Sequence, residues 1–99
     1  MAPASETINP SQVEHLAERS RFRILVDGAA SELDYRVNAD VMSILHTGVP
    51  PQLEGRGIAA ALTRAALEHA RSQGWKVRPL CSYAAAYLRR HPETAVLQA

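Results

Sequence analysis

The chain has 99 residues, which fits one small domain, and 46% of them are hydrophobic, which is enough for a core. Its 11 basic and 10 acidic side chains are well mixed and leave a net charge of +1, so charge does not favour nucleic acid or a membrane surface as a partner. One cysteine excludes an internal disulfide, and no apolar run approaches the ~20 residues that span a bilayer. We expect a cytoplasmic protein, monomeric or weakly dimeric.

The N-terminal region gives the weakest signal. Residues 1–10 lack the basic-then-apolar layout of a signal peptide, and we expect them to form a disordered tail. In residues 11–18, Ser11 and Glu14 have the spacing of a helix capping box, whereas apolar and polar side chains alternate as in a short strand. Both alternatives stay open.

An antiparallel meander is expected next. Alternating side chains indicate strands over residues 21–27, 32–37 and 41–49. Asp27-Gly28 is a strong signal for a tight hairpin, and residues 38–40 form the second turn. The side chains expected to face the core are Phe22, Ile24, Val26, Leu33, Tyr35 and Val37. The other face of this sheet is expected to be partly solvated.

The C-terminal half predicts a helix, a strand and a second helix. Helical periodicity runs over residues 57–73, with Gly74 as the expected stop. Its buried stripe should contain Ile58, Ala59, Leu62, Ala65, Ala66 and Ala70. A short strand follows over residues 76–80, and then a helix over residues 83–90 with Ser82 as its N-cap.

The most informative stretch lies before the first helix. Gly55 and Gly57 lack a Cβ and can adopt positive φ, so backbone N–H groups can turn toward a ligand that approaches closely. The helix that follows adds unpaired first-turn donors and the positive end of its dipole. With Arg56 between the glycines, this arrangement predicts a site for an anionic group such as a phosphate.

Two common phosphate-binding motifs do not fit this loop. Gly55, Gly57 and Ala60 match the dinucleotide fingerprint, but that motif needs a parallel βαβ unit and an acidic residue roughly 20 residues on. Residues 76–81 contain no acidic side chain, and the preceding segments are predicted hairpins. A P-loop is also excluded, because no Gly-Lys-Ser/Thr follows the first glycine.

The loop resembles the acyl-CoA pyrophosphate loop of the GNAT acetyltransferase superfamily, whose signature is Gln/Arg-x-x-Gly-x-Gly/Ala, often preceded by Val-x-Pro. Gln52, Gly55 and Gly57 fill the first pattern, and Val49 with Pro51 fill the second. The chain also resembles a compact subgroup of small GNAT-like proteins over most of its length. The matching segments are His46-Thr47, Val49-Pro50, Gly57-Ile58-Ala59, Pro79-Leu80-Cys81-Ser82-Tyr83 and His91-Pro92-Glu93.

This resemblance implies an α/β (α+β) protein with a minimal GNAT-like fold, an antiparallel β-meander followed by helix, strand and helix. The domain would cover residues 11–93, with a C-terminal tail over residues 94–99, and the strand alternative is favoured for residues 11–18. The first two helices usual in the family are missing, because the sequence leaves room there only for a tight turn. Those helices normally wall the acceptor site, so that side should be open or closed by another molecule.

The resemblance further implies acetyl-CoA as cosubstrate. The residues expected to bind it are Thr47, Val49, Gln52, Leu53, Gly55, Arg56, Gly57 and Ile58. Where the family often has a basic residue this chain has Glu54, whose carboxylate we expect to point outward. No metal is expected, because His15 and His69 have no partner at ligand spacing and a lone cysteine makes no zinc site.

Four side chains are candidates for the chemistry. Neutralising a lysine amine at pH 7 costs about 4.6 kcal/mol (~3.4 pH units at ~1.36 kcal/mol each), so a general base would help. His46 is the titratable group of the strand before the loop and suits that role, or it packs at the sheet edge. Cys81, expected beside the cleft where the family places pantetheine, is either an acyl-accepting thiolate or a small buried side chain. Tyr83 or Tyr87 is the candidate acid for the CoA thiolate, with core packing as the alternative.

The implied function is acetyl-CoA-dependent N-acetyltransfer to a small-molecule or protein amine. One alternative is an acyl-CoA-binding sensor or interaction module with little turnover, because a clear base and the usual acceptor wall are missing. The other is self-acylation at Cys81.

Overall fold

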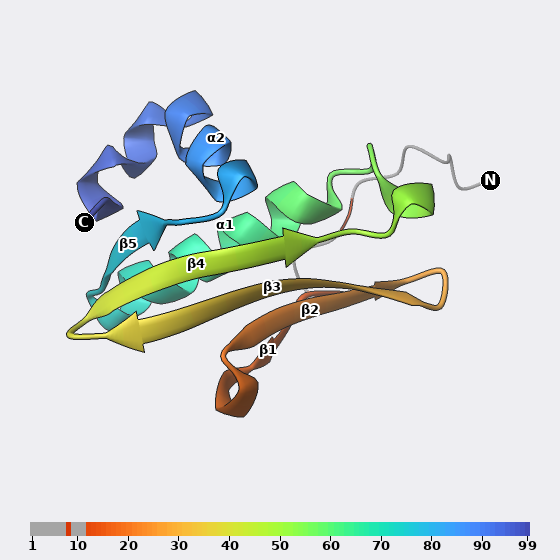
Figure 1. The fold of residues 1–99 in the computed structure, drawn as a ribbon, viewed down its shortest axis with the longest axis horizontal. Helices are drawn as coiled ribbons and strands as arrows, with labels where there is room; N and C mark the ends of the chain where they lie inside the picture. Colours follow the sequence, from red (N-terminus) through yellow and green to blue (C-terminus); the bar gives the residue numbers. More distant parts are fainter. Residues whose placement is uncertain (1–7, 9–11) are drawn as a thin grey trace.

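The computed structural model describes Ile8 and residues 12–99 (Figure 1). Its strands are β1 (Glu14–Leu16), β2 (Arg21–Val26), β3 (Ala29–Asn38), β4 (Val41–Gly48) and β5 (Lys76–Pro79), its α-helices are α1 (Ile58–Gln73) and α2 (Ser82–Arg90), and short 3₁₀ helices cover Ala17–Arg19, Pro51–Leu53 and Pro92–Leu97. The strands form a five-stranded sheet in chain order, antiparallel from β1 to β4, with β5 parallel to β4. The expected meander followed by helix, strand and helix is confirmed.

The N-terminal expectations fall partly outside the described residues. Of the tail expected over residues 1–10, the structure describes only Ile8, whose side chain is buried in the core. For residues 11–18 the structure has the strand, because β1 pairs antiparallel with β2 and places His15 opposite Phe22. The helix alternative is wrong for Glu14–Leu16, and Ala17 and Glu18 belong to the short 3₁₀ helix that follows the strand.

Both hairpins turn at the residues that the sequence predicts. The φ angles are 52° and 78° at Asp27 and Gly28, and 53° and 62° at Ala39 and Asp40. Positive φ at both central residues is the type I′ turn, whose twist matches that of the flanking strands. The first turn thereby fixes the register of β2 with β3, and the second fixes that of β3 with β4 as far as the pair Tyr35–Ile44.

The core lies between one face of the sheet and the helices. Buried on that face are Phe22, Ile24, Val26, Leu33, Tyr35, Met42, Ile44 and Val77. Helix α1 packs across β2 to β5, and α2 packs beside it against β4 and β5 (Figure 1). The opposite face carries Arg23, Asp34 and Arg36, and none of the described elements covers it. The sheet therefore has one dry and one wet face, as its alternation predicts.

Helix α1 buries most of its predicted apolar stripe and, in addition, a second side that was not predicted to be buried. It ends at Gln73, and the next residue is the predicted stop, Gly74, with a φ of 76°. In the predicted stripe, Ala59 and Ala65 are only half-buried and the other members are buried. Thr63 and Leu67 are buried as well, because α2 and the C-terminal 3₁₀ helix pack against the helix on a second side.

The expectation of a tail over residues 94–99 is wrong. Thr94 and Leu97 are buried, and the Ala99 N–H donates to the Val77 carbonyl at 2.9 Å. The segment covers the outer edge of β5 and satisfies backbone groups that would otherwise be unpaired. Apart from the last residue, its apolar side chains are one short consecutive run, Ala95-Val96-Leu97, which has neither a helical nor an alternating pattern.

Candidate functional site

Strands β4 and β5 separate halfway along β4. Their pairing ends at Ile44 and Pro79. The Ile44 carbonyl then accepts the N–H groups of Leu80 and Cys81, at 3.0 and 3.1 Å, and the chain turns into α2. Strand β4 continues to Gly48 paired only with β3, so one edge of its backbone is open over the last residues.

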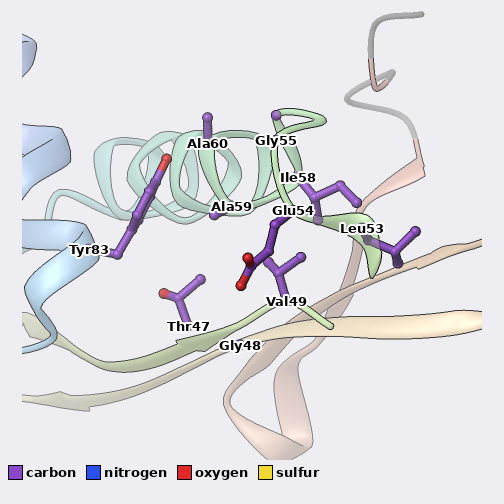
Figure 2. A pocket seen from close by; sticks show the side chains of 11 residues that line it. Thr47, Gly48, Val49, Leu53, Glu54, Gly55, Ile58, Ala59, Ala60 and Tyr83 are labelled. Carbon is purple, nitrogen blue, oxygen red and sulfur yellow. The ribbon is translucent and has the colours of Figure 1, made fainter. Parts of the chain in front are cut away.

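A pocket of about 540 Å³ lies between this open edge, the start of α1 and the start of α2 (Figure 2). Its lining consists of Thr47, Gly48, Val49, Leu53, Glu54, Gly55, Gly57, Ile58, Ala59, Ala60 and Tyr83. Of the residues expected to bind the cosubstrate, Thr47, Val49, Leu53, Gly55, Gly57 and Ile58 are therefore together, and Gln52 and Arg56 lie outside the lining. Of the four catalytic candidates, Tyr83 alone lines it.

The loop before α1 has the conformation expected of its glycines. Gly55 and Gly57 have φ angles of 83° and 82°, and a Cβ built at either would meet open space. No described side chain caps α1, and the Ala61 N–H is the one that bonds back to the Gly57 carbonyl, at 3.0 Å. The N–H groups of residues 58–60 therefore lie beside the pocket without intrahelical acceptors. This geometry fits an anionic group.

The side chain of Arg56 departs from its expected position. Its Nη1 donates to Asp27 Oδ2 at 2.8 Å, at the tip of the β2–β3 hairpin. Gln52 is exposed on the 3₁₀ helix before the loop. Charge for an anion at the loop would thus come from the main chain and the helix dipole, with the Arg56 guanidinium turned elsewhere.

The expectation that Glu54 points outward is wrong. Glu54 lines the pocket, and Figure 2 shows its carboxylate directed toward Val49 and Thr47. Gly48, Ala59 and Ala60 also line the pocket, although none of the three was expected from the sequence to bind the cosubstrate. The two alanines follow from the loop, because first-turn N–H groups must face the same ligand as the glycines. The direction of Glu54 has no such sequence signal.

His46 lies away from the pocket. A β-bulge at Leu45 shifts the register between β3 and β4, so that His46 pairs with Asp34 on the wet face of the sheet. The side chain is exposed, and its Nε2 would be 3.0 Å from a Cβ at Gly48. The imidazole therefore lies over the outer side of the strand whose inner side meets the pocket.

Cys81 stands at the point where β4 and β5 separate. It is half-buried, and its Sγ lies 3.6 Å from Thr47 Oγ1. The Sγ also accepts the Ala84 N–H at 3.3 Å, so Cys81 is the N-cap of α2 in place of the expected Ser82. The thiol is thus held at the positive end of a helix dipole and next to a residue that lines the pocket.

The two tyrosines of α2 have different surroundings. Tyr83 rises from the start of α2 toward Ala60 on the far wall of the pocket (Figure 2). Burial raises the pKa of Tyr83, Tyr87 raises it further and Arg90 acts in the opposite direction. Tyr87 is buried and stacks on His91 at 4.0 Å between ring centroids, which is a packing role.

Two features are absent from Ile8 and residues 12–99. These residues contain no group of three or more His, Cys, Asp or Glu side chains arranged to hold a metal ion. They also contain no helix with the length and apolar character needed to cross a membrane.

Known proteins share both the sequence pattern and the fold. Residues 21–97 match the model of the GCN5-related N-acetyl-transferase family. Protein NATD1 of Gallus gallus is 34% identical to this chain over 86 residues, which cover 84% of this chain and 78% of that protein. Protein NATD1 of Homo sapiens is 33% identical over 86 residues, which cover 84% of this chain and 76% of that protein. The NMR structure of a GCN5-like protein from Staphylococcus aureus superposes with a TM-score of 0.72 at 28% identity, covering 93% of this chain and 91% of that one. The chain therefore belongs to the GCN5-related N-acetyltransferase family.

Proposed function

We propose that this chain binds acetyl-CoA in the pocket and transfers the acetyl group to an amine of a small molecule or a protein. The observation that carries the proposal is the extent of the pocket, from the free N–H groups of residues 58–60 to Thr47, beside the separation of β4 and β5. One end suits a diphosphate and the other brings a thioester next to ionisable side chains. A cytoplasmic location is proposed with it, because the single free thiol suits a reducing compartment.

Two kinds of main-chain donor would hold the cosubstrate. The loop from Gly55 to Ile58 offers N–H groups to the diphosphate. The open edge of β4 from Thr47 to Val49 offers unpaired backbone groups to the amides of the pantetheine arm, as an added strand would be held. The apolar side chains of Leu53 and Ile58 exclude water between these two regions.

Tyr83 is the proposed acid. A tyrosine hydroxyl has an ordinary pKa of about 10, and burial raises the pKa of Tyr83. The hydroxyl is therefore protonated at neutral pH, and it lines the pocket where it can give a proton to the departing CoA thiolate. The chemistry supplied by the bound thioester is an activated acetyl carbonyl. No base role is proposed for His46, because its side chain lies on the wet face of the sheet.

Two alternative functions are each supported by one observation. The lining has Glu54 and Tyr83 as its ionisable side chains and no histidine, which suits an acyl-CoA sensor with little turnover. The contact of Cys81 with Thr47 suits self-acylation instead. In that step Sγ forms a bond to the acetyl carbon, the carbon–sulfur bond to CoA breaks, and the proton lost by the thiol goes to the CoA thiolate.

One set of measurements separates these outcomes. Binding of acetyl-CoA is followed by calorimetry, release of free CoA is followed over a panel of amines, and intact mass is recorded for the wild type and Cys81→Ala. Amine-dependent release without a mass gain supports direct transfer. A gain of one acetyl group that Cys81→Ala abolishes supports self-acylation, and binding without release supports the sensor. Absence of binding overturns the proposal.

A further inference from the structure

The tip of the β2–β3 hairpin is tied to the phosphate loop. Asp27 and Arg56 are 29 residues apart in sequence, yet Arg56 Nη1 donates to Asp27 Oδ2 at 2.8 Å. The hairpin side of this contact is firmly placed, because β2 and β3 pair continuously up to Val26 and Ala29 and a type I′ turn closes them. The loop around Arg56 belongs to no strand, so no sheet hydrogen bonds hold it in place.

The ion pair determines where the Arg56 side chain goes. The side chain is 25% exposed, and its Nε is buried without a hydrogen-bond partner among the described residues. Gly55 and Gly57 on either side line the pocket, whereas Arg56 does not. Positive φ at both glycines turns the main-chain N–H groups toward the pocket, while the Arg56 side chain runs to the hairpin.

We infer that Asp27 is a positioning residue for the phosphate loop, acting through Arg56; this rests on the proposed function. The ion pair holds the loop in the conformation that presents its N–H groups, and the guanidinium itself does not bind the ligand's phosphates. The contrasting role is that Arg56 leaves Asp27 and binds a phosphate directly. In that case Asp27 would compete with the ligand, so the two roles predict opposite effects of removing the Asp27 charge.

The test measures the affinity for CoA in four variants by calorimetry. Asp27→Asn tolerates the positive φ at this position, and both it and Arg56→Gln should weaken binding about two- to fivefold, as expected for the loss of an exposed ion pair. The double variant Asp27→Arg/Arg56→Asp restores the pair with reversed charges and should return the affinity to within about twofold of wild type. Asp27→Arg alone controls for the strain of arginine at positive φ.

Glu14→Gln is a matched control, because it breaks the exposed Arg23–Glu14 pair at the far edge of the sheet and should leave CoA affinity unchanged. Amide hydrogen exchange without ligand gives a second readout, and residues 55–58 should exchange faster in Asp27→Asn than in Glu14→Gln. Tighter CoA binding by Asp27→Asn than by the wild type overturns the inference in favour of direct phosphate binding. So does weak CoA binding by the charge-reversed double variant when Asp27→Arg alone binds CoA normally. If the amide hydrogens of residues 55–58 exchange at the same rate in Asp27→Asn and Glu14→Gln, the inference is overturned regardless of ligand binding. If the wild type does not bind CoA, the proposed function fails first.

Discussion

The two ends of the pocket are built from different parts of the chain. At the phosphate end the groups that face the ligand are backbone N–H groups of the loop and of residues 58–60. At the reacting end they are the side chains of Thr47 and Tyr83, with Cys81 next to them. Main-chain donors are fixed once the loop folds, whereas each side chain depends on strand register and rotamer. The first end should therefore control affinity, and the second should control rate.

The largest effect is expected from Gly57→Glu. The new side chain would project into open space at the pocket, where it adds bulk and a negative charge beside the proposed diphosphate site. We expect CoA affinity to fall by at least about 100-fold, which corresponds to about 2.7 kcal/mol. Calorimetric titration measures it.

The control for this variant is Gly74→Glu at the other end of α1. Gly74 also has a positive φ, of 76°, so this substitution imposes similar backbone strain far from the pocket. Both variants should lose a similar amount of thermal stability, while Gly74→Glu keeps its affinity. Equal affinity in wild type and Gly57→Glu would contradict the assignment of the phosphate end.

The phosphate end could be predicted from sequence for a physical reason. Paired glycines before an amphipathic helix permit few alternatives to a loop of positive φ, and that conformation sets the N–H groups directly. The meander was predictable as well, since Asp27-Gly28 and the strict alternation in β3 each determine register locally.

The reacting end could not be predicted in the same way. Strict alternation from Ile44 would place His46 on the helix-facing side and Thr47 on the wet face, but the bulge at Leu45 exchanges the two. The sequence around Leu45 contains no glycine or proline that would mark the bulge. Glu54 is a second case, because its direction depends on how the loop packs and not on its own pattern.

The next largest effect is expected at the reacting end, from Tyr83→Phe. Loss of the hydroxyl that returns a proton to the CoA thiolate should slow amine-dependent CoA release by about 100-fold, with CoA affinity within about twofold of wild type. Steady-state rates and calorimetry measure the two quantities. Tyr87→Phe is the control, because Tyr87 is buried and outside the pocket lining. A variant that loses affinity and keeps its rate would place Tyr83 at the binding end.

Glu54→Gln should produce a smaller change of opposite sign. Glu54 is the acidic residue of the pocket lining, and its carboxylate repels the phosphates of the ligand. We expect affinity for CoA to rise about threefold at low salt, and the gain to shrink as added salt screens the charge. Glu68→Gln, at an exposed position on α1, is the control. A loss of CoA release with normal affinity would instead make Glu54 part of the reacting end.

The pH dependence of stability must be separated from that of rate. Burial lowers the pKa of His15 from 6.5, and His69 lowers it further while Glu18 acts the other way. His15 therefore binds a proton more readily in the unfolded chain than in the folded one. Its contribution to the free energy of unfolding is fully present above pH 6.5 and is lost as the pH falls through the lower folded-state pKa. Urea unfolding at about pH 7.5 and about pH 5.5 should show this fall, reduced in His15→Gln. Equal stability at both pH values would contradict it.

The smallest effect is expected from His46→Gln, which tests whether the two faces of β4 are chemically independent. The imidazole lies on the wet face, opposite Asp34, and the strand separates it from the pocket. CoA affinity and the rate of CoA release should stay within about twofold of wild type from about pH 6 to about pH 8, with the same pH profile. If the variant instead releases CoA much more slowly at normal affinity, the imidazole reaches the reacting end around Gly48. The reacting end would then include the outer face of the strand, and the acceptor amine would approach from the uncovered side of the sheet.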